Sequence, residues 1–168
     1  LLDKLKTYPT MRNQLRAWLK SGILEQGKIF KTNEGTPQGG VISPLLANIA
    51  LHGMEKRIKA YARRLKGDKA KNERAISLIR YADDFVILHE NLEVILQCQK
   101  IISKWLNKLG LQLKPSKTKI SHTLNEYDGK PGFDFLGFTI RQFSAGNDHS
   151  GKRHGLPLGF KTIIQPSQ

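Results

Sequence analysis

The sequence has few of the residues that would mark a disulfide scaffold, a zinc site or a membrane protein. A single cysteine, Cys98, excludes an intrachain disulfide. Its helix-like surroundings predict a small half-buried side chain rather than a nucleophile or a metal ligand. The five histidines show no paired spacing of the kind that zinc sites use. No apolar run approaches the roughly 20 residues that a transmembrane helix needs.

Acidic residues are also scarce. The 168 residues include 14 Asp and Glu against 28 Lys and Arg, which gives a formal net charge of +14. With 39% hydrophobic residues the composition is that of a globular chain, so the charge is not a sign of disorder. A basic globular chain favours a polyanionic partner, and nucleic acid is the first candidate. An anionic membrane surface and a merely solubilising charge are the alternatives.

Two of the few acids are adjacent, Asp83 and Asp84, and they lie between the short apolar runs 76–79 and 85–88. This pattern predicts a β-hairpin with both carboxylates at or beside its tip. Carboxylates are costly in a sheet core, so they should face water, a basic partner or a metal ion. In so basic a chain, a metal ion that also holds phosphates is the sharpest hypothesis.

A glycine-rich loop at residues 35–40 precedes a helix that begins at Ser43 and Pro44 and is expected to run towards Arg64. Such a loop suits a phosphate or a nucleotide, although an ordinary tight loop has the same composition. It is not a Walker A loop, because no Gly-Lys-Ser/Thr follows.

The rest of the chain mixes helical and alternating patterns, which predicts an α+β fold: an antiparallel sheet with helices packed on one face. We expect two short helices before residue 22, a strand or hairpin at 23–32, a surface loop at 66–75 and a helix from Asn91 to Gly110. An alternating run at 111–114, a turn at Pro115-Ser116 and an extended segment at 117–120 should follow, and then a hairpin at 133–141, a mobile loop at 144–157 and a last strand at 158–164.

Four blocks in this order resemble those of a reverse transcriptase, and their wording is similar to group II intron reverse transcriptase/maturases. The blocks are Gly35–Gly40 with Ser43-Pro44, Tyr81-Ala82-Asp83-Asp84, Leu113–Lys119 and Phe135–Phe138. The resemblance covers residues 35–141 and implies a polymerase palm. It divides the chain into a connector at 1–34, the palm core at 35–143, and a loop and strand at 144–168 that lead towards a thumb and maturase region.

The resemblance also implies roles for particular residues. Asp83 and Asp84 would bind catalytic Mg²⁺, with Mn²⁺ as an alternative, for two-metal nucleotidyl transfer. Lys117 would act catalytically beside the departing pyrophosphate. The incoming nucleotide and template would lie against Pro37, Gln38, Gly39 and Gly40. The primer would be held by Tyr81, Phe135, Leu136, Gly137 and Phe138.

The partners implied are an intron RNA template, a DNA primer and deoxynucleoside triphosphates, without a membrane. The setting implied is bacterial cytoplasm or an organelle, and the parent protein would also assist RNA splicing. The family needs a further metal-binding Asp from an earlier strand. Asp3 lacks that context, and the chain starts at Leu1 without Met, so we expect a piece cut at both ends that is inactive alone. The alternative is a fragment that binds RNA as a maturase and no longer polymerises. A palm of another polymerase class fits the blocks poorly.

Overall fold

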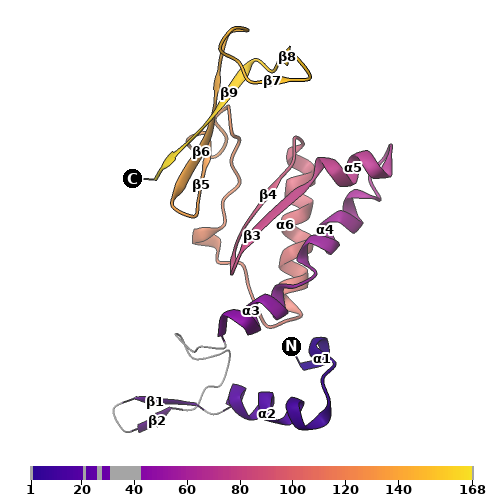
Figure 1. Cartoon of the computed structure of the whole chain (residues 1–168), viewed down its shortest axis with the longest axis vertical. Coiled ribbons are helices and arrows are strands. Elements are labelled where there is room, and N and C mark those ends of the chain that lie inside the picture. Colours follow the sequence, from indigo (N-terminus) through magenta and orange to yellow (C-terminus); the bar gives the residue numbers. More distant parts are fainter. Residues whose placement is uncertain (1, 21, 26–27, 31–42, 168) are drawn as a thin grey trace.

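A computed structural model describes residues 2–20, 22–25, 28–30 and 43–167 of the chain (Figure 1). Its helices are α1 (Leu2–Leu5), α2 (Pro9–Lys20), α3 (Ser43–Leu51), α4 (Met54–Ala62), α5 (Lys69–Ala75), α6 (Leu92–Asn107) and the 3₁₀ helix η1 (Pro115–Lys117). Its strands are β1 (Ile23–Glu25), β2 (Lys28–Phe30), β3 (Ser77–Tyr81), β4 (Asp84–Leu88), β5 (Phe133–Phe135), β6 (Phe138–Ser144), β7 (Lys152–Arg153), β8 (Leu156–Pro157) and β9 (Phe160–Pro166).

The α+β prediction is confirmed, and every described strand pair is antiparallel. The described strands form separate small sheets: three two-stranded hairpins, β1-β2, β3-β4 and β7-β8, and one three-stranded sheet in the order β5-β6-β9. In Figure 1 the β3-β4 hairpin lies over the long helix α6, and the β5-β6-β9 sheet lies at the other end of the molecule from α2.

The main core lies between α4, α6 and one face of the β3-β4 hairpin. Its largest fully buried side chains are Met54, Ile58, Ile76, Cys98 and Ile102. From the hairpin, the side chains of Leu78, Phe85 and Ile87 pack against this cluster. Cys98 is fully buried in this core, where a half-buried side chain was expected, and burial raises the pKa of its thiol to about 11.

Several local expectations were wrong, and each has a physical reason. The helix expected from Ser43 to Arg64 is broken at Gly53, whose φ of 93° lies outside the right-handed helical region. The expected loop at 66–75 contains α5, which Asp68 caps by accepting from the backbone N–H groups of Ala70 and Lys71.

Two further expectations also need correction. The turn expected at Pro115 and Ser116 is present as the 3₁₀ helix η1, which is closed by the Thr118 N–H and hydroxyl donating to the Lys114 carbonyl. No strand forms in the segments 111–114 and 117–120 on either side of it. The expected mobile loop at 144–157 contains the β7-β8 hairpin, which turns through His154 and Gly155 at positive φ. The last strand is β9, two residues later than expected at each end.

Within the part of the chain that the structure describes, no helix is long and apolar enough to cross a membrane.

Candidate active site

The β3-β4 hairpin presents the two adjacent acids as predicted. Tyr81 pairs with Asp84 in the last register of the ladder, so Ala82 and Asp83 form a two-residue turn. Ala82 has a φ of 52°, a left-handed conformation that alanine rarely adopts and that costs roughly 1 kcal/mol. The turn is therefore held by its surroundings rather than chosen by local preference.

The hairpin has one packed face and one open face. Because side chains alternate along a strand, Leu78 and Phe85 point to the helices while Tyr81 and Asp84 point away from them. Tyr81 is 66% exposed, and both Asp83 and Asp84 are exposed. Among the described residues, neither carboxylate makes an ion pair or a side-chain hydrogen bond. Two acids are thus displayed without partners from that part of the chain, at the most sharply bent point of the hairpin.

Arg80 fixes this turn from the packed side. Its guanidinium Nη1 donates to the Ala82 carbonyl at 2.5 Å and to Asn48 Oδ1 on α3 at 2.9 Å. One side chain thus joins the strained turn residue to the helix that follows the glycine-rich loop. Sequence reasoning missed both Arg80 and Asn48. A basic residue at a core-facing position of a strand, two residues before the turn residue it contacts, was the available signal.

The donor set fits a hard divalent cation. Mg²⁺ prefers carboxylate oxygens and keeps several water molecules, so a pair of exposed aspartates at one turn suits it. No group of three or more His, Cys, Asp or Glu side chains that would hold a metal occurs among the described residues. Asp3 does not serve here: it is ion-paired with Arg12 at 2.6 Å, and this partner lowers the pKa of its carboxyl.

The Phe135–Phe138 block forms the tip of a second hairpin. Phe135 pairs with Phe138, and the two turn residues Leu136 and Gly137 have φ values of 52° and 79°. Positive φ at both central positions is the pattern of a type I′ turn. A Cβ added at Gly137 would meet nothing within 4 Å, so this glycine serves the turn and not a close backbone approach within the described chain.

This second tip is exposed and tied to the end of the chain. Leu136 and Phe138 are each 48% exposed, and the backbone N–H of Ser167 donates to the Gly137 carbonyl at 2.9 Å. Strand β5 contacts β4, so the structure brings the two hairpins together through these strands.

The other site residues predicted from the sequence fall in different places. Lys117 is exposed at the end of η1, in a segment that borders α6 through Leu113, Pro115 and Thr118. Its role at a pyrophosphate stays a prediction. The block Pro37, Gln38, Gly39 and Gly40 lies outside the described residues, so its assignment to nucleotide and template also stays a prediction.

Comparison with known proteins agrees with these features. Residues 1–140 match the family model "Reverse transcriptase (RNA-dependent DNA polymerase)". The chain is 30% identical to the group II intron-encoded protein LtrA of Lactococcus lactis subsp. cremoris, over 84% of this chain and 32% of LtrA. It is 31% identical to protein YkfC of Escherichia coli K12, over 73% of this chain and 36% of YkfC.

A more distant relative is an uncharacterised 91 kDa protein in the cob intron of Schizosaccharomyces pombe, 28% identical over 75% of this chain. The chain spans about a third of the length of the two bacterial relatives. Because the family model covers most of the residues, including the acidic hairpin, the chain belongs to the reverse transcriptase family of RNA-dependent DNA polymerases.

Proposed function

We propose that the intact protein containing this chain is the reverse transcriptase of a group II intron. It would copy intron RNA into DNA during retrohoming and assist splicing of that RNA. The observation that carries the proposal is the pair of exposed carboxylates on the braced β3-β4 turn of a chain that belongs to the reverse transcriptase family. Similarity to a group II intron-encoded protein supports the intron RNA as template.

In this proposal Asp83 and Asp84 hold the catalytic Mg²⁺ ions, or Mn²⁺ in their place. When bound, such ions stabilise the charge that develops on a transferring phosphoryl group and activate the attacking hydroxyl. The residues of the chain do the positioning. Tyr81 shares the open face with Asp84 and supports the primer end.

The remaining roles follow from the predicted blocks. Phe135, Leu136, Gly137 and Phe138 hold the primer from the neighbouring hairpin. The Pro37–Gly40 block contacts the incoming deoxynucleotide and the template, and Lys117 neutralises or protonates the departing pyrophosphate. We assign residues 1–34 to a connector, 35–143 to the palm core, and 144–168 to the approach to a thumb. A cytoplasmic setting in bacteria, or an organellar one, follows from this function.

A primer-extension assay tests the proposal. The intact protein should extend a DNA primer on an RNA template with Mg²⁺, and Asp83→Asn should abolish extension. RNA affinity of that variant should be equal or higher, because a carboxylate facing RNA phosphates is removed. Asp148→Asn, which changes an exposed acid far along the chain, is the matched control and should retain extension. Full extension by Asp83→Asn would refute the metal-ligand assignment.

The second candidate is a maturase that binds intron RNA without polymerising. The observation that favours it is the small donor set: among the described residues only two adjacent acids are available at the turn. In that case wild-type protein would support splicing and bind RNA, yet extend no primer with either Mg²⁺ or Mn²⁺.

A further inference from the structure

The two-helix segment formed by α4, α5 and their connection, residues 54–75, carries a dense positive charge. Nine of its residues are basic and three are acidic, a formal charge of +6 that is nearly half of the net +14. An ordinary solvated surface interleaves the two signs more evenly. We call this segment's surface the α4-α5 basic surface. The question is which acidic groups compensate its positive charge.

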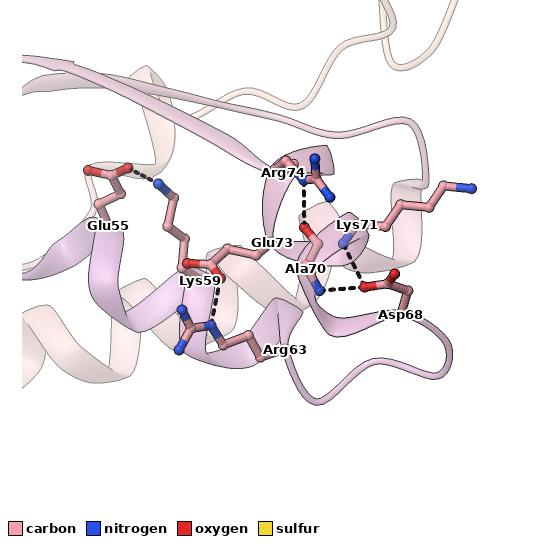
Figure 2. A network of polar contacts seen from close by, with 8 residues as sticks. All are labelled: Glu55, Lys59, Arg63, Asp68, Ala70, Lys71, Glu73 and Arg74. Carbon is pink, nitrogen blue, oxygen red and sulfur yellow. Dashed lines mark hydrogen bonds and ion pairs between the residues drawn. The ribbon is translucent and has the colours of Figure 1, made fainter.

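All three acids are engaged inside the segment (Figure 2). Glu55 pairs with Lys59 at 2.5 Å, and Glu73 pairs with Arg63 at 2.6 Å across the two helices. Asp68 accepts from the N–H groups at the start of α5. The acids thus organise the segment, and none is left over to neutralise its remaining cations.

None of the cations that are left forms an ion pair with an acid among the described residues, although Arg74 and Lys71 lie near enough to Asp68 to be attracted to it. Arg74 donates from Nε to the Ala70 carbonyl, 3.2 Å away. Six more basic side chains are exposed and make neither an ion pair nor a side-chain hydrogen bond in that part of the chain: Lys56, Arg57, Arg64, Lys66, Lys69 and Lys71. Gathering them at low ionic strength costs free energy through mutual repulsion, which a polyanion would reverse.

Both helices beneath these cations are anchored to the rest of the fold. Helix α4 is anchored in the core by Met54, Ile58 and Ala62, each at most 1% exposed. Helix α5 is tied back by Asn72, whose Nδ2 donates to the carbonyls of Leu65 and Lys66 at 3.1 and 3.3 Å. The anchored helices hold the backbone of the charged residues in place, so binding has to order only their side chains, which favours a localised contact over a diffuse one.

The lack of exposed apolar side chains on this surface excludes some classes of partner. None of the exposed large hydrophobic side chains among the described residues lies in 54–75, so the surface has no apolar anchor for a lipid bilayer. Its one aromatic residue, Tyr61, is half-buried against the core, so it offers no platform on which unpaired bases would stack. Cations without stacking groups suit the regular phosphate backbone of a duplex.

The surface is also separate from the candidate active site. Helix α5 ends two residues before the first residue of β3, and the Ala82–Asp83 turn lies at the opposite end of this five-residue strand. At about 3.3 Å per residue, the strand places roughly 16 Å between them. Figure 1 shows α5 at the upper end of the hairpin and the turn at its lower end.

We propose that the α4-α5 basic surface binds the phosphate backbone of double-stranded RNA, as a contact separate from the primer and template at the acidic turn. The proposal deepens the function proposed above and rests on it for the choice of RNA over DNA. The expected ligand is a folded, helical part of an RNA, read by its backbone geometry and not by its sequence.

The test compares two charge-matched triple variants in equilibrium binding to a 20-base-pair RNA duplex at several salt concentrations. The first, Arg64→Gln/Lys66→Gln/Lys69→Gln, removes three cations from the surface. The control, Lys104→Gln/Lys108→Gln/Lys161→Gln, removes three exposed cations elsewhere. Removing one phosphate contact should lower the slope of log K against log salt by close to one, so the first variant should flatten it by about two to three. The control should change the slope by less than one.

Further measurements make the outcome decisive. Thermal unfolding of both variants should match the wild type, and Arg64→Lys/Lys66→Arg/Lys69→Arg should restore binding because it keeps the charge. Equal slope changes in the two triple variants would refute a localised contact. A loss confined to DNA duplex, to single-stranded RNA or to vesicles of anionic phospholipid would refute duplex RNA as the partner. Asp83→Asn should bind the duplex normally, so failure of the polymerase proposal is seen separately in primer extension.

Discussion

Arg80→Ala should disturb the geometry of the acidic turn while leaving the apolar core packed. Arg80 makes two hydrogen bonds, to the Ala82 carbonyl and to Asn48. Hydrogen bonds from a charged donor contribute about 1.5–3 kcal/mol each when well shielded, but this guanidinium is partly exposed. We therefore expect a loss of roughly 1–2 kcal/mol in the free energy of unfolding. For a chain of this size, that corresponds to a fall of about 2–8 °C in melting temperature.

The functional loss should be larger than the stability loss suggests. Without Arg80, the Ala82 carbonyl loses the hydrogen bond that helps to hold this residue in its left-handed conformation. Asp83 is the next residue in the turn, so its carboxylate would shift with it. A displacement near 1 Å at a reacting centre costs about 100-fold in rate. In primer extension by the intact protein, kcat should fall by up to that factor, while KM for primer and template should change little, because the proposed primer and template contacts remain.

Two companion variants sharpen the assay. Arg80→Lys keeps the charge but offers a single donor centre in place of the planar fork, so it should recover only part of kcat. Asn48→Ala removes one of the two bonds, and its effect should be smaller than that of Arg80→Ala. The double variant should cost less than the sum of the two single changes, because the residues share a bond. Additive effects, or wild-type kcat in Arg80→Ala, would refute the positioning role.

Two further predictions concern the scaffold. Ile102→Ala removes a side chain with no exposed surface and should cost about 2–5 kcal/mol in chemical denaturation, whereas Lys104→Ala on the open side of α6 should cost less than about 0.5 kcal/mol. The N–H groups of Lys71 and Ala70 hold the pKa of Asp68 below its ordinary value of 3.8, so its cap stabilises the start of α5 above that pH and is lost as the pH falls through the lowered pKa. After correction for the intrinsic pH dependence of exchange, hydrogen exchange in α5 should accelerate on acidification. Asp68→Ala should show the same faster exchange already at neutral pH. Equal protection of α5 at neutral and acidic pH in the wild type would contradict the role of Asp68 as its cap.

The sequence predicts the parts of the fold that local chemistry dictates. The sequence predicts helix α6 from its apolar periodicity and Asn91 as its N-cap, and both are confirmed. The Asn91 side chain accepts from the Glu93 N–H. The acidic turn between two apolar strands is likewise local. The Gly53 break was overlooked because Leu51 and Met54 continue an apolar pattern on both sides of it, and α5 was overlooked because its residues are nearly all polar.

The sequence pattern did not predict the contacts between distant segments. Arg80 and Asn48 are 32 residues apart, and nothing in either neighbourhood specifies the other. The grouping of strands into separate small sheets is equally non-local, since alternation marks a strand but not its neighbour. The acids of the site were therefore predictable, while the residues that hold them in place were not.

The helix break at Gly53 leaves the last carbonyls of α3 without helical partners, and a lysine from the start of the chain binds at this end of the helix. Lys4 of α1 reaches across 46 residues of sequence and donates to Ala50 O at 2.5 Å and to His52 O at 2.9 Å, while its ammonium lies 4.8 Å from the centre of the Trp105 ring. The same helix α3 carries Asn48, which holds Arg80. Helix α3 is thus held at its end by Lys4, and through Asn48 it holds Arg80 and the acidic turn. The N-terminal residues therefore help to position the candidate active site.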